Sequence, residues 1–178
     1  MDRLIYTAMT GASQAFMRQA GVANNLANAS TTGFRAMEHR FRAVPVQGPG
    51  APTRAFVVDA SVANVFDQGP LMATGRPLDV AVQGAGWIAV EGANGAEAYT
   101  RAGNLQVNVN GQLQTASGLN VLGDGGPVAI APNNYNTIAP DGTVSDISSF
   151  GTPNIVNVVG RIKLVKPPED QLVRGDDG

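Results

Sequence analysis

The sequence predicts an α+β protein in which a mainly antiparallel β domain follows one long N-terminal α-helix and an extended hinge. Apolar residues recur every three or four positions over residues 3–28, which is the period of an amphipathic helix. From residue 55 onward, short strand-like runs alternate with turn residues. Asn110-Gly111 and Asp141-Gly142 each lie between two such runs, the strongest short-range signal for a β-hairpin. The sequence has no second helical pattern, which disfavours repeated β-α-β units.

The predicted helix places apolar residues along one side. Gly11 and Gly21 each lower helix stability by about 1 kcal/mol relative to Ala, so the helix depends on partners that pack on its apolar side. Such a helix can pack on its own domain, but its length and the hinge after it favour packing on other chains. We name these residues the apolar stripe and propose them as an assembly interface: Leu4, Ile5, Ala8, Met9, Ala12, Phe16, Ala23 and Leu26, with Ala20 and Ala27 continuing the same side.

Turn-forming residues end the helix and divide the chain. Asn28 begins a polar stretch that closes at Gly33, and residues 44–54 hold three Pro and two Gly. We therefore expect a helix with its loop at 1–34, an extended Pro/Gly-rich linker with a strand at 35–75, and a β-rich domain at 76–178. The expected strands are 55–66, 78–82, 87–91, 98–102, 104–109, 112–115, 119–122, 127–130, 136–139, 143–146 and 155–165.

Composition and charge exclude several function classes. The net charge is −2, which argues against a nucleic-acid partner, and the absence of Cys excludes disulfides and thiolate metal sites. Residues 1–54 carry six Arg against two acids, whereas residues 55–178 carry six bases against twelve acids. This asymmetry is either ordinary solvated surface or a means by which subunits orient on one another. The sequence has no apolar window long enough for a membrane span, and no secretory signal pattern opens it.

The motifs that suggest a cofactor or a reaction each have a simpler interpretation. Residues 84–89 match G-x-G-x-x-A, but residues 87–90 read as a strand where a dinucleotide site needs a helix. The single histidine, His39, is most simply a surface residue. Glu91 and Glu97 are a possible carboxylate pair, but a flexible hairpin tip separates them. Trp87 is most simply a core residue. We therefore expect no catalytic residue, no cofactor, no metal, no small-molecule substrate and no nucleic acid.

Several segments resemble one known family. Residues 23–34 (ANNLANASTTGF) closely resemble the N-terminal signature of the flagellar rod and hook family, and residues 1–12 (MDRLIYTAMTGA) are similar to its proximal-rod branch of basal-body proteins. Residues 75–90 and 99–123 resemble the central segments of the same family. The signature residues are Asn24, Asn25, Leu26, Ala27, Asn28, Ser30, Thr31, Thr32, Gly33 and Phe34.

The resemblance implies a structural subunit and not an enzyme. Such a subunit would self-assemble with copies of itself and with other rod subunits into the periplasmic shaft that transmits torque from the motor to the hook. It would reach the basal body through the flagellar type III export apparatus, without a cleaved signal peptide. Family members end in a second long helix that pairs with the first, and we expect this sequence to stop before that helix.

Two alternatives remain open at this point. The first is a distal-rod or hook subunit of the same family, against which the opening residues argue. The second, from another class, is a β-rich carbohydrate-binding or adhesin module, for which Trp87 is the one supporting residue.

Overall fold

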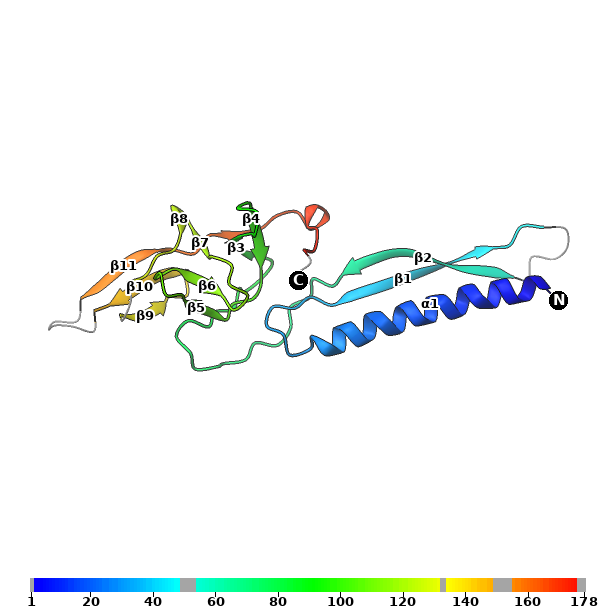
Figure 1. The fold of residues 1–178 in the computed structure, drawn as a ribbon, viewed down its shortest axis with the longest axis horizontal. Coiled ribbons are helices and arrows are strands. Elements are labelled where there is room, and N and C mark those ends of the chain that lie inside the picture. The colour runs from blue at the N-terminus through cyan, green and yellow to red at the C-terminus, as the bar shows by residue number, and fades with distance from the viewer. Residues whose placement is uncertain (1, 49–53, 132–133, 149–154, 176–178) are drawn as a thin grey trace. The chain divides into compact units, whose positions relative to one another are not determined.

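The computed structural model describes residues 2–48, 54–131, 134–148 and 155–175, and its regular structure there is one α-helix followed by short strands (Figure 1). All strand pairings among these residues are antiparallel, which confirms the predicted α+β class with mainly β content. The elements are α1 (Asp2–Ala27), β1 (Met37–Pro45), β2 (Ala55–Asn64), β3 (Trp87–Glu91), β4 (Glu97–Thr100), β5 (Leu105–Val107), β6 (Leu113–Thr115), β7 (Leu122–Gly123), β8 (Gly126–Pro127), β9 (Tyr135–Ile138), β10 (Thr143–Ile147), β11 (Val156–Arg161), β12 (Leu164–Val165) and the 3-10 turn η1 (Glu169–Gln171).

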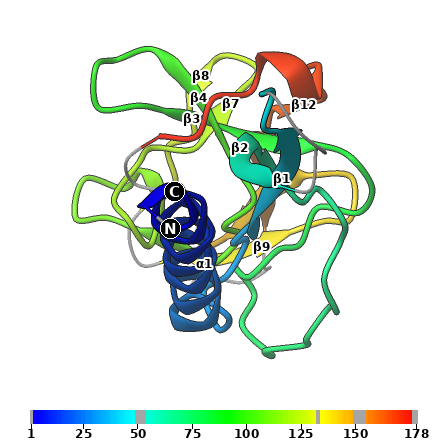
Figure 2. The same ribbon diagram turned by 90° about the vertical axis from the view of Figure 1, so that its right-hand side faces the viewer.

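The chain divides into two compact units, which we name the helical unit (Met1–Asp67) and the β unit (Gln68–Gly178). In the helical unit, β1 and β2 form a hairpin that pairs from Met37–Asn64 to Pro45–Ala55, with a bulge where the register shifts between Arg40 and Phe41. Helix α1 runs alongside this hairpin and contacts both strands (Figures 1 and 2).

The hairpin differs from the linker expected at 35–75. Residues 37–45 form the whole of β1, and the N–H of Val46 donates to the carbonyl oxygen of Arg54, which extends the pairing into the predicted hinge. Residues 49–53 of that hinge lie outside the described residues. In β1, half-buried Met37, His39 and Phe41 alternate with exposed charged residues. This alternation is the period of a half-buried strand, and the prediction of a linker at 35–75 did not take it into account.

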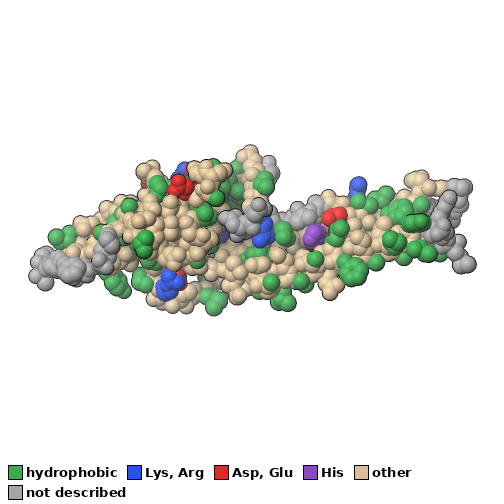
Figure 3. All heavy atoms as spheres, in the orientation of Figure 1, with side chains coloured by type: hydrophobic (Ala, Val, Ile, Leu, Met, Phe, Trp, Pro, Cys, Tyr) green, Lys and Arg blue, Asp and Glu red, His purple; other side chains and the backbone are tan. Residues whose placement is uncertain are grey.

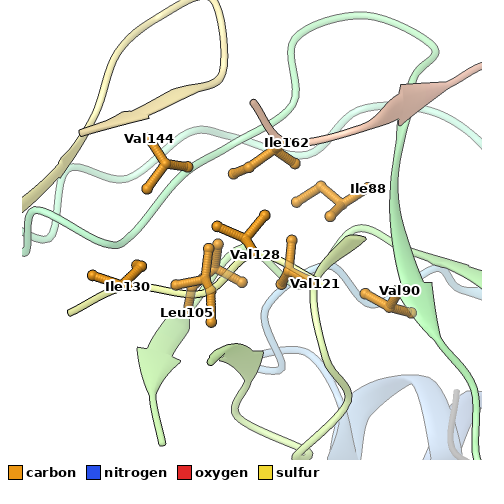
Figure 4. Close-up of a cluster of buried hydrophobic side chains, with 9 residues drawn as sticks. Ile88, Val90, Leu105, Val121, Val128, Ile130, Val144 and Ile162 are labelled. Carbon is orange, nitrogen blue, oxygen red and sulfur yellow. The ribbon is translucent and has the colours of Figure 1, made fainter. Parts of the chain in front are cut away.

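In the β unit, short hairpins surround one apolar core. The unit holds two three-stranded sheets, β12-β3-β4 and β11-β10-β9, and the two-stranded pairs β5-β6 and β7-β8. Side chains from separate hairpins converge in the core (Figure 4). The buried cluster is Ile88, Val90, Leu105, Leu113, Val121, Val128, Ile130, Val144 and Ile162.

The two predicted hairpin turns are confirmed, whereas the predicted strand at 78–82 is wrong. Gly111 and Gly142 have positive φ in the turns between β5 and β6 and between β9 and β10. Residues 78–82 form a single bridge at Asp79 and no strand. This segment instead runs so close to Gly103 that a Cβ there would overlap the carbonyl oxygen of Val80. The predicted strand 155–165 is divided into β11 and β12.

Candidate assembly surface on helix α1

The apolar stripe of α1 lies on the surface of the helical unit. All eight of its residues are exposed, and Phe16 and Leu26 keep 72% and 75% of their surface accessible. Figure 3 shows hydrophobic side chains along the surface of α1. The helical unit therefore leaves the residues of the apolar stripe exposed to solvent.

The opposite side of α1 packs on the β1-β2 hairpin through small and polar residues. Thr7, Gln14 and Gly21 of α1, and Asn28 directly after its last residue, are spaced by seven residues, so they lie on the same side at every second turn. All four are buried or half-buried. At Gly21 the helix and the hairpin are so close that a Cβ would lie 2.9 Å from Cδ2 of His39. We name these residues the hairpin-facing side.

Asn25 joins the end of α1 to the start of β1. Its Nδ2 donates to the carbonyl oxygen of Met37 at 2.9 Å, and the Met37 N–H donates to Asn25 Oδ1 at 3.1 Å. The side-chain amide thus bonds both backbone groups of Met37, as a neighbouring strand would. This contact gives one residue of the predicted signature a structural role.

The rest of the signature forms the turn that ends the helix. The Asn28 Nδ2 donates to the Asn24 carbonyl oxygen at 3.0 Å, and the Thr31 hydroxyl donates to Asn28 Oδ1 at 3.3 Å. Gly33 takes a φ of 77° and the Phe34 N–H donates to the Thr31 carbonyl oxygen. Leu26, Ala27, Ser30 and Thr32 are exposed beside these bonds. The signature therefore ends α1 and directs the chain into β1.

His39 is not the simple surface residue that the sequence suggested. Its side chain is 20% exposed, its Nδ1 lies 3.8 Å from Asp59 Oδ2, and its ring stacks with Phe41 at a centroid distance of 6.3 Å. Sequence reasoning missed Thr7 and Gln14 of the hairpin-facing side, and three exposed apolar residues outside the stripe, Tyr6, Met17 and Val22. The spacing of seven between small and polar residues was the available signal for the former.

The candidate carboxylate pair has structural partners in the β unit. Glu91 and Glu97 lie opposite each other on β3 and β4. Glu91 accepts a hydrogen bond from Asn120 at 2.8 Å, and Glu97 accepts one from Lys163 at 2.6 Å, which raises the pKa of Lys163. Each carboxylate is thus held by a different neighbour on the surface.

Other candidate chemistry finds no support among the described residues. The Trp87 ring lies 5.5 Å from the guanidinium carbon of Arg101. Residues 84–85 form a bend and Trp87 begins β3, so the glycine motif is a turn before a strand, as predicted. Within the described ranges, no three His, Asp or Glu side chains are grouped to hold a metal ion, and α1 is not apolar enough to span a membrane.

Comparison with known proteins connects both units to one group. Residues 5–35 match the model described as flagella basal body rod protein, and residues 81–146 match the flagellar hook protein FlgE/F/G D1 domain. The chain is 49% identical over its whole length to the flagellar basal-body rod protein FlgF of Salmonella typhimurium and to that of Escherichia coli, and covers 70% of each. It is 32% identical to the flagellar basal-body rod protein FlgG of Agrobacterium fabrum, over 96% of this chain and 72% of that relative.

Proposed function

Because the chain belongs to the FlgF family of flagellar basal-body rod proteins, we propose that it is a structural subunit of the proximal rod, the part of the drive shaft nearest the motor. The rod transmits torque by rigid contact between subunits, so the subunit acts through its surfaces and not through a reaction. The observation that carries this proposal is the exposed apolar stripe on a helix whose opposite side already packs on its own hairpin.

The stripe supplies a driving force for assembly. In an isolated chain the large apolar side chains of the stripe are exposed to water, which raises the free energy of the chain by about 25 cal/mol for each Å² of apolar surface. Helices from neighbouring subunits would lower the free energy by packing their stripes against one another. The alanines at positions 8, 12 and 23 would permit the close approach of these helices. Several such contacts for each subunit would make a stiff assembly from individually weak interfaces.

The charges of the two units favour an ordered arrangement of subunits. The helical unit carries six Arg against four acids, and the β unit carries six Lys or Arg against ten acids. Opposite net charges on the two units would orient an incoming subunit so that unlike units meet. We propose copies of this chain and other rod subunits as its partners, and the flagellar type III export apparatus as its route to the basal body.

A chimera tests the proposal. Residues 1–178 would replace the matching segment of FlgF in a Salmonella typhimurium strain that lacks its own FlgF. We expect restored motility and the chimera in purified basal bodies. A chimera that accumulates in cells but stays absent from basal bodies would overturn the proposal. Placing the same segment in FlgG of a strain lacking FlgG is the matched test for the sibling function, and we expect no motility there.

A further inference from the structure

One loop of the β unit is anchored at both ends by side-chain hydrogen bonds. At one end Gln68 receives a hydrogen bond from the Gly84 N–H at 3.3 Å and donates to the Val82 carbonyl oxygen at 3.5 Å. At the other end Arg76 donates to the Leu105 carbonyl oxygen at 3.1 Å. Between these anchors, residues 69–75 make no backbone–backbone hydrogen bond to any described residue. Figure 1 shows this segment bowing away from the strands.

The anchored loop projects two apolar side chains. Leu71 is 57% exposed and Met72 is 84% exposed, and neither belongs to the apolar core of the β unit. These two adjacent side chains would remove apolar surface from water if a partner covered them. The backbone N–H and C=O groups of the same residues, which make no backbone–backbone bond to a described residue, would be available to that partner.

The helical unit carries a groove whose chemistry matches the loop. Gly11, Ala15 and Val22 of α1 line one wall, and Phe41 and Val57 of the hairpin line the other. Within this groove, the Oε1 of Gln14 is buried and has no hydrogen-bond partner in the described part of the chain. Arg18, at the same place, is exposed and makes no ion pair with a described residue.

Resting on the proposed rod function, we propose that Leu71 and Met72 of one copy dock in this groove of a second copy. The groove runs from Gly11 to Val22, about 16 Å along the helix, which equals the reach of about five extended residues. Asp67, which directly precedes the loop and is exposed, would supply a carboxylate to Arg18.

The symmetry of this contact is the one that a rod requires. The groove and the loop are different surfaces of the same chain, so each copy would present a loop to one neighbour and a groove to another. Such a heterologous contact does not close on itself in pairs, and it generates rings or open helical assemblies. Ala15 and Val22 of the groove lie seven and fourteen residues after Ala8 of the stripe, so the docked loop would lie directly beside the apolar stripe.

Cysteine cross-linking between two differently tagged chains tests the docking, since the native sequence has no Cys. One chain carries Met72→Cys and the other Ala15→Cys, and the two purified chains are mixed at high concentration and oxidised. We expect a mixed disulfide dimer to form at least tenfold faster than in a control that pairs Ala15→Cys with Val109→Cys, which is 99% exposed in the β unit. Adding Leu71→Asp to the Met72→Cys chain should abolish the difference.

The same pairs introduced into the chimera and tested in purified basal bodies separate this inference from the rod function. A chimera that enters basal bodies with no cross-link above the Val109→Cys control would overturn the docking and leave the rod function standing. Equal rates for both pairs in solution would also overturn it. So would a chain carrying both Met72→Cys and Ala15→Cys that forms only an intramolecular disulfide.

Discussion

The side-chain amide of Asn25 bonds both backbone groups of Met37: its Nδ2 donates to the Met37 carbonyl oxygen at 2.9 Å, and its Oδ1 accepts from the Met37 N–H at 3.1 Å. The last turn of α1 therefore bonds the first residue of β1 as a neighbouring strand would. Asn25→Ala would leave both half-buried groups without these bonds, and we expect a loss of about 1–3 kcal/mol in the free energy of unfolding. Amide exchange at Met37 should accelerate at the same time.

Asn24→Ala is the matched control for this prediction, because Asn24 is exposed and its side chain makes no hydrogen bond to a described residue. Asn25→Asp is the sharper variant, since it keeps the acceptor and replaces the donor with an oxygen that faces the Met37 carbonyl. If Asn25→Ala and Asn24→Ala had equal effects on stability and on Met37 exchange, the proposed structural role of Asn25 would be wrong.

The two glycines of α1 should respond differently to Ala. A Cβ on Gly11 meets no atom within 4 Å, so Gly11→Ala should stabilise the helix by about 0.5–1 kcal/mol. At Gly21 the new methyl must displace the His39 ring, and the gain in helix propensity should be cancelled. In a His39→Ala background the gain should return. Chemical denaturation would give the free energies of unfolding of Gly11→Ala, Gly21→Ala, His39→Ala and the double variant Gly21→Ala/His39→Ala. Equal gains in stability from Gly11→Ala and Gly21→Ala in the native background would disprove the prediction.

Phe16→Asp should separate folding from assembly. Because Phe16 is 72% exposed, we expect its substitution to change the free energy of unfolding by no more than about 0.5 kcal/mol. In the chimera the same change should block entry into basal bodies, since a charge would be buried without a partner. Leu113→Ala is the opposite control: it should cost about 2–5 kcal/mol because Leu113 is fully buried in the core. A large loss of stability in Phe16→Asp would place the stripe in the core of the helical unit.

Gly103 should tolerate no side chain. A methyl there would overlap the carbonyl oxygen of Val80, which is backbone and cannot turn aside, so Gly103→Ala should cost about 3 kcal/mol. Gly160→Ala in β11 is the control, since a Cβ there meets nothing within 4 Å, and it should change stability by no more than about 0.5 kcal/mol. Thermal unfolding followed by circular dichroism would show a lower melting temperature for Gly103→Ala alone.

Asp141 should make the β9-β10 turn sensitive to acid. The Thr143 hydroxyl donates to its carboxylate at 2.7 Å, which is the main reason that the pKa of Asp141 lies below its ordinary 3.8. The folded state therefore favours the ionised form. The stability that this bond contributes is fully present above pH 3.8 and is lost as the pH falls through the lower folded value. Carboxyl NMR titration measures the shift, and Thr143→Val should return the pKa of Asp141 toward 3.8. An unchanged titration in that variant would assign the shift to another cause.

The sequence was most informative where a single local rule decided the structure. The period of α1 and the two Asn-Gly and Asp-Gly turns are local signals, and all three appear in the fold. Residues 78–82 look like a strand in isolation, but the tight approach of Gly103 leaves them a single bridge. That approach joins residues more than twenty positions apart, so no local pattern contains it.

The candidate site was predictable on one side of the helix only. Apolar periodicity identified the exposed stripe, whereas the hairpin-facing side consists of Thr, Gln, Gly and Asn, which carry no hydrophobic signal. The surroundings of His39 depend on the register of β1 with β2, because Asp59 lies opposite Phe41 across the bulge. An interpretation of residues 35–75 as a linker therefore could not have placed His39 correctly.

The way in which β3 is paired also sets the timing of folding. One of its neighbours, β4, follows after a short turn, but the other, β12, is more than seventy residues further along the chain. The local hairpins can form early, whereas the closure of β12 on Ile88 and Trp87 carries the larger entropic barrier. Because Ile88 is part of the buried cluster, we expect the core of the β unit to close only after β12 has paired with β3. While a ribosome or a narrow channel still holds residues 164–165, we expect the β unit to remain a set of hairpins. The pairing of β12 with β3 would follow once these residues are released.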